Sequence, residues 1–60
     1  MEDLQAQVER VRQELIATEE RYNEARTQGN RRDVLQLEGE LDRLNREMTD
    51  LLERMRQPQA

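Results

Sequence analysis

Apolar residues follow a heptad spacing in two stretches of the chain. From Leu4 to Ala25 they recur at alternating steps of four and three residues, and from Val34 to Met55 at steps of three and four. This spacing keeps them on one stripe of an α-helix, as in the seam of a coiled coil. The predicted seam residues are Leu4, Val8, Val11, Leu15, Thr18, Tyr22 and Ala25 in the first stretch, and Val34, Leu37, Leu41, Leu44, Met48, Leu51 and Met55 in the second.

The two stripes do not join into one continuous helix. Past Ala25 the first spacing reaches Gly29 and then polar residues, whereas the second stripe starts at Val34, two residues out of step. A stutter or a stammer would displace the stripe by four or three residues instead. Gly29 suits the left-handed conformation that ends a helix, and Asn30 is a good N-cap for the next one. The sequence therefore predicts helices over about 3–28 and about 31–56, joined by a tight turn at 29–30.

Two further residues support these boundaries. Asp33 stands three residues after Asn30, where it resembles the second half of a capping box, and its charge suits a helix N-terminus. Pro58 cannot continue a helix, so residues 57–60 are expected to form a short C-terminal tail. The 60 residues then make a single helical domain.

The numbering of the seam residues favours a hairpin. When the chain is folded back at Gly29 and Asn30, every seam residue of the first stretch meets one of the second with an index sum of 59, as Leu15 meets Leu44. Each pair sets an a position against a d position, as an antiparallel coiled coil requires. The predicted fold class is all-α, an antiparallel αα-hairpin.

Large apolar residues also occur outside the seam, at Ile16, Leu35 and Leu52. Two helices alone make a thin core, and domains of this size commonly oligomerise to compensate. We expect these three residues to form a second interface that joins two hairpins into an antiparallel four-helix bundle, with the chain itself as the partner. A different protein that covers the same residues is the alternative partner.

Composition narrows the possible chemistry. The chain has 14 acidic residues against 10 basic ones, all arginine, and it lacks Cys, His, Lys and Ser. Disulfides, Cys/His zinc sites and the usual nucleophile–base pairs are therefore excluded. We expect no enzymatic activity, no cofactor and no metal. An acidic N-terminus without a following apolar segment, and the lack of any long apolar run, predict a cytoplasmic protein without membrane contact.

Charge suggests two alternatives to a self-associating scaffold or adaptor. The net charge of −4 would suit a small acidic regulator or inhibitor, for example one encoded by a phage, that binds a nucleic-acid-handling enzyme. Arg26, Arg31 and Arg32 gather near the turn and could contact phosphate, so nucleic-acid binding through the tip is the third hypothesis. Because the chain is acidic overall and has one aromatic residue, we do not expect nucleic acid to be the main partner.

Overall fold

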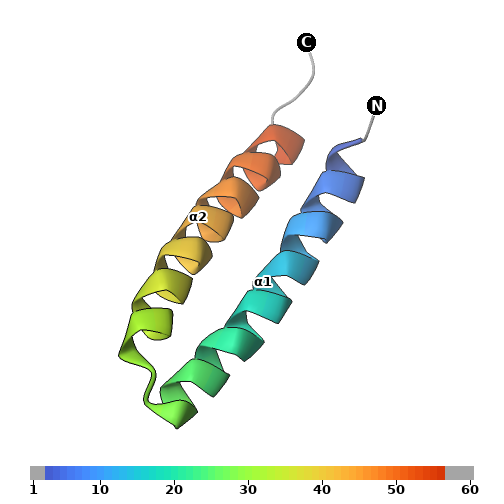
Figure 1. Cartoon of the computed structure of the whole chain (residues 1–60). Helices are drawn as coiled ribbons and strands as arrows, with labels where there is room; N and C mark the ends of the chain where they lie inside the picture. The colour runs from blue at the N-terminus through green and yellow to red at the C-terminus, as the bar shows by residue number, and fades with distance from the viewer. Residues whose placement is uncertain (1–2, 57–60) are drawn as a thin grey trace.

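Two helices fold back on each other in the computed structural model of the chain, which describes residues 3–56 (Figure 1). Helix α1 spans Leu4–Gln28 and helix α2 spans Arg31–Arg56. The predicted all-α hairpin is therefore confirmed. Within the described residues, no helix is long and apolar enough to cross a membrane.

Helix α1 is capped at both ends by residues of the chain itself. At its start, the carboxylate of Asp3 accepts a 2.7 Å hydrogen bond from the backbone N–H of Ala6. At its end, Gly29 has φ 72° and ψ 23°, and its N–H donates to the carbonyl of Arg26 over 3.1 Å. The N–H of Asn30 donates to the carbonyl of Ala25 over 2.9 Å, which completes a Schellman motif.

Asn30 also begins helix α2. Its side-chain oxygen accepts from the Asp33 N–H at 3.2 Å, while its side-chain nitrogen donates to the Asp33 carboxylate at 2.9 Å. In a standard capping box Asp33 would instead accept from the backbone N–H of Asn30. That N–H is already bonded to Ala25, so the carboxylate takes the amide nitrogen. One residue thus closes the first helix and opens the second.

The interface between the helices follows the heptad stripes. Three buried residues, Val11, Leu44 and Leu51, form a cluster against which partly buried neighbours pack. The buried side chains of the described chain are Val11, Thr18, Ala25, Leu44 and Leu51, and the half-buried seam residues are Leu4, Val8, Leu15, Tyr22, Val34, Leu37, Leu41 and Met48.

Met55 differs from the other predicted seam residues, because 48% of its surface remains exposed. Its seam neighbour by index is Leu4, the first residue of helix α1, so no earlier helical turn is there to cover it. The predicted tail at 57–60, with Pro58, lies outside the described residues.

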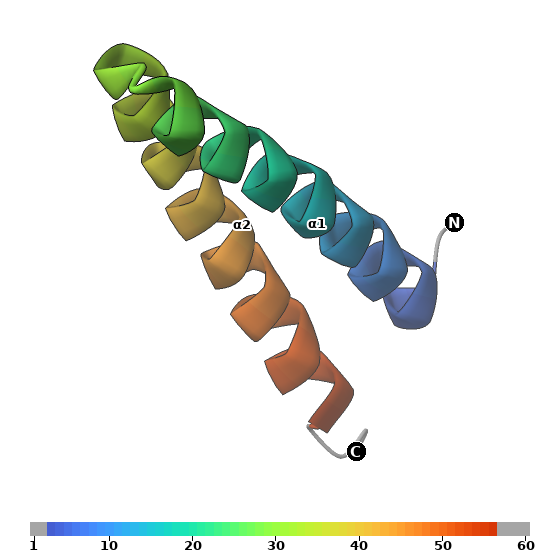
Figure 2. The ribbon, with the colours of Figure 1, turned by 90° about the horizontal axis from the view of Figure 1, so that it is seen from below.

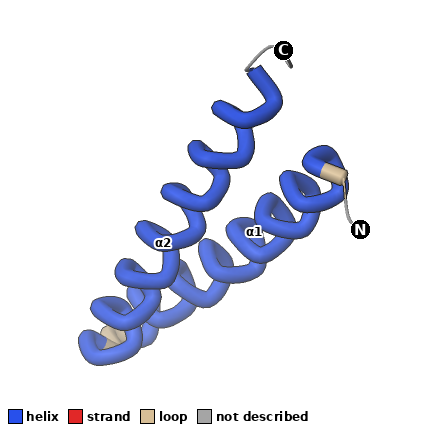
Figure 3. The backbone as a smooth tube through the Cα atoms, turned by 90° about the horizontal axis from the view of Figure 1, so that it is seen from above, coloured by secondary structure: helices blue, strands red, loops and turns tan. Residues whose placement is uncertain are grey.

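The axes of the two antiparallel helices are inclined to each other. Figures 2 and 3 show α1 and α2 close together at the turn and further apart toward the chain ends. The buried residues of α1 nearest the turn are small, Thr18 and Ala25, whereas larger side chains fill the other half. Since the distance between helix axes depends on the side chains at the contact, the small buried residues Thr18 and Ala25 allow the helices to approach near the turn.

The one buried polar side chain of the described seam has an acceptor within its own helix. Thr18 is 7% exposed, and its hydroxyl donates to the carbonyl of Glu14 over 2.7 Å. A Thr hydroxyl in a helix commonly bonds to the carbonyl four residues earlier. The α1 side of the seam therefore accommodates Thr18 without leaving a buried polar atom that lacks a hydrogen-bond partner.

Candidate interaction surface

The hairpin has two flanks, one on each side of the seam. Heptad positions b and e of both helices lie on one flank, and positions c and g lie on the other. A shallow groove lies on each flank, in agreement with this division. Glu19, Asn23 and Asn45 are among the residues that line the groove on the first flank. The groove on the second flank is lined by residues that include Arg21, Gln28, Gln36 and Glu40.

We call the first flank the Ile16 face. Its three large apolar side chains are Ile16, Leu35 and Leu52, which are 49%, 66% and 47% exposed. All three residues predicted for a second interface therefore lie on the same side of the hairpin, unburied within one chain. The Ile16 face comprises Gln5, Glu9, Arg12, Ile16, Glu19, Asn23 and Arg26 of α1, and Arg31, Leu35, Glu38, Asp42, Asn45, Thr49, Leu52 and Arg56 of α2.

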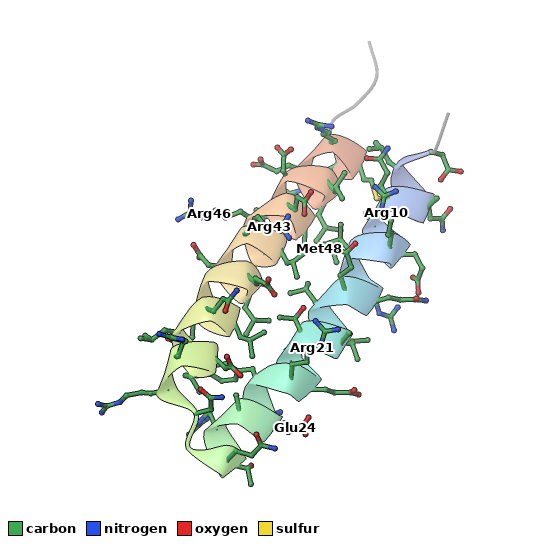
Figure 4. All side chains as sticks on the ribbon, in the orientation of Figure 1. Arg10, Arg21, Glu24, Arg43, Arg46 and Met48 are labelled. Carbon is green, nitrogen blue, oxygen red and sulfur yellow. The ribbon has the colours of Figure 1, made fainter. Side chains whose placement is uncertain are left out.

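The opposite flank, the charged face, carries no large apolar side chain among the described residues. Figure 4 shows Arg10, Arg21 and Arg43 projecting from the two helices on this side of the seam. The charged face comprises Gln7, Arg10, Glu14, Ala17, Arg21, Glu24 and Gln28 of α1, and Asp33, Gln36, Glu40, Arg43, Glu47, Asp50 and Arg54 of α2.

Ion pairs between residues 3 and 56 stay within single helices. Arg46 and Asp42 approach to 3.1 Å, Arg54 and Asp50 to 3.2 Å, and two longer pairs also join residues three or four positions apart. Exposed pairs of this kind contribute about 0.3–0.5 kcal/mol each. They stiffen each helix, whereas the choice of partner helix depends on the apolar stripes and the turn.

A side-chain hydrogen bond crosses from one helix to the other on the Ile16 face. The hydroxyl of Tyr22 donates to the carboxylate of Glu38 over 3.1 Å. The heptad spacing places Tyr22 in the seam but does not by itself predict this bond. The heptad register could have indicated this bond, because Glu38 directly follows Leu37, the seam partner of Tyr22. The long Tyr22 side chain places its hydroxyl beyond the seam, beside that residue.

The three arginines predicted as possible phosphate contacts lie on both helices near the turn. Arg26 lies with its guanidinium 5.8 Å from the centre of the Tyr22 ring, a cation–π contact on α1. Arg31 and Arg32 are exposed in the first turn of α2. Cations at a helix N-terminus oppose the helix dipole, so this placement gains no local stabilisation.

The described surface carries many exposed carboxylates. Its grooves are shallow and open to solvent, and none of its acidic residues gather into a group of three or more that could hold a metal ion. Glu47, which stands opposite Glu14 in the heptad register, instead approaches Arg43 at 3.6 Å on its own helix. The distinctive feature is therefore the Ile16 face.

Comparison with protein-family models, curated protein sequences and solved structures finds no match to the chain.

Proposed function

We propose that the chain is a non-enzymatic protein-contact module that self-associates and serves as a scaffold or adaptor. The observation that carries this proposal is the exposure of three large aliphatic side chains on one flank of a hairpin with a thin core. Scattered apolar residues are normal on protein surfaces, but here all three share one flank and the other flank has none. Covering them with a second hairpin would produce a four-helix bundle.

The exposed area supports association. The chain exposes 5249 Å², whereas a compact folded monomer of 7.2 kDa exposes about 4,100 Å². The difference, roughly 1,100 Å², is larger than the area of about 800 Å² that each partner buries in a standard interface. Packing a second hairpin on one face would therefore remove much of this excess exposed surface.

Light scattering over a concentration series tests the proposal. We expect the wild-type chain to have the mass of a dimer, and the Ile16→Glu variant to have the mass of a monomer because a charge would be buried. Ala17→Glu is the matched control, since the adjacent residue lies on the charged face and should leave the mass unchanged. A wild-type monomer at every concentration would refute self-association and direct the search to a different protein that covers the Ile16 face.

A further inference from the structure

We infer that two hairpins pack antiparallel through their Ile16 faces, about a twofold axis that passes beside Ile16. This inference rests on the proposed self-association and specifies its face, its symmetry and its register. It follows from the positions of the three exposed aliphatic residues along the hairpin.

These three positions are symmetric along the hairpin axis. In the seam, residue n of α1 lies level with residue 59 − n of α2, so Ile16 lies level with position 43. Leu35 and Leu52 stand on either side of that level, each about 13 Å away at 1.5 Å per residue. The aliphatic residues of the Ile16 face are thus evenly placed, with Ile16 in the middle.

A twofold axis at this midpoint makes the face complementary to itself. Rotation would place Ile16 against Ile16 of the second copy, because both lie beside the axis. It would place Leu35 of each copy against Leu52 of the other, since α2 would run antiparallel to α2 of the second copy. All six exposed aliphatic side chains would then be covered by aliphatic neighbours, as an isologous interface requires.

The polar residues between them also match. The same rotation sets Arg12 opposite Glu19 of the second copy, which gives two oppositely charged pairs around the axis. Along α2 it sets Glu38 opposite Thr49 and Asp42 opposite Asn45, so that no carboxylate faces another carboxylate. The side-chain amide of Asn45 is a donor for Asp42, whereas the hydroxyl of Thr49 already donates to the Asn45 carbonyl of its own helix. The like-charged combination on α2, Arg31 opposite Arg56, falls at the solvated ends, where a surface pair has little effect.

The alternative packing, with the two turns at the same end, is much less complementary. There α2 of one copy would lie over α1 of the other at the same level. Leu35 would then face Asn23 and Arg26, and Leu52 would face Gln5 and Glu9. This arrangement leaves every exposed aliphatic residue against polar groups, so the antiparallel packing is favoured.

The dimensions of the hairpin require that the whole face be used. Each helix is about 38 Å long and about 10 Å wide, so one long side of the two-helix hairpin offers an area close to the roughly 800 Å² that each partner buries in a standard interface. A contact restricted to one end would be far smaller. Leu35 and Leu52, which lie near opposite ends of α2, must therefore both take part.

Disulfide formation tests the register directly, because the chain contains no cysteine. An Ile16→Cys variant should form a covalent dimer under mild oxidation, since the two side chains meet at the axis. The Ala17→Cys control, on the charged face, should stay uncrosslinked. Leu35→Cys and Leu52→Cys should each stay uncrosslinked alone, whereas their equimolar mixture should give the mixed disulfide.

The outcomes separate this inference from the proposed function. A dimeric mass with crosslinking at position 17 and none at 16 would overturn the face but leave self-association standing. Crosslinking at 16 without the mixed 35–52 disulfide would overturn the register. A monomeric mass at all concentrations would overturn both proposals.

Charge exchange provides a test that needs no cysteine. Arg12→Glu should weaken the dimer about tenfold, because two ion pairs across the axis become repulsive. Adding Glu19→Arg to the same chain should restore the wild-type dissociation constant, since the pairs then form with reversed polarity. A double variant that dimerises as weakly as the single one would overturn the register.

Discussion

The two glycines of the described chain should respond in opposite ways to the same substitution. Gly39 lies inside helix α2, where an added Cβ would meet no heavy atom within 4 Å. Glycine in a helix interior is about 0.8–1.0 kcal/mol less favourable than alanine. Gly39→Ala should therefore stabilise the chain by about 1 kcal/mol.

Gly29 has equal space for a Cβ, so its backbone conformation decides the result. Its φ of 72° lies in the left-handed region, which costs an L-residue roughly 1–2 kcal/mol. Gly29→Ala should therefore destabilise the chain by that amount. The two variants differ from each other by about 2–3 kcal/mol although the chemical change is identical.

Thermal unfolding followed by far-ultraviolet circular dichroism checks this prediction. A change of 1 kcal/mol shifts the midpoint by about 4–8 °C in a domain of this size, so the two variants should be separated by about 8 °C or more. All samples must have the same chain concentration, because association raises the apparent stability. A lower midpoint for Gly39→Ala would refute the reasoning, since it would mean that another helix packs closely against the outer surface of α2.

Three further substitutions follow from the packing and the caps. Leu44→Ala should lower the free energy of unfolding by about 2–5 kcal/mol in urea titrations, because Leu44 is only 2% exposed; a loss below 1 kcal/mol would contradict its central place in the core. Asn30→Ala should cost about 1 kcal/mol because the Asp33 N–H loses its acceptor, and Asn30→Ser, which keeps an oxygen there, should recover most of that loss. Thr18→Val should change stability by less than about 1 kcal/mol, since the lost hydroxyl bonds only to the Glu14 carbonyl, and a larger loss would indicate another partner.

The hairpin could be predicted from the sequence because several independent signals agreed. Two heptad stripes, a displacement of two residues between them, and the Gly29–Asn30 pair at that displacement all specify the same turn. The structure then shows the details of that turn, where Gly29 takes the left-handed conformation and Asn30 bonds to both helices.

Side-chain pairing was less predictable. The heptad register offers contacts across the helices, such as Arg21 with Glu40, and also contacts along each helix. For long exposed side chains these options differ by only tenths of a kcal/mol, so sequence spacing alone does not decide among them. The exposure of Met55 likewise depends on where helix α1 begins, which the stripe pattern fixes only to within a few residues.

The displacement between the stripes also explains why the chain turns back instead of continuing as one long helix. Each residue of an α-helix rotates by about 100°, so a displacement of two residues sets the second stripe about 200° from the first. A continuous helix through Gly29 and Asn30 would thus present its two apolar stripes on opposite sides. No single straight partner helix could cover both stripes, whereas the closed hairpin buries each stripe against the other. In the closed form, the left-handed Gly29 and the bonds made by Asn30 give partners to backbone groups that the break between the two helices would otherwise leave unpaired.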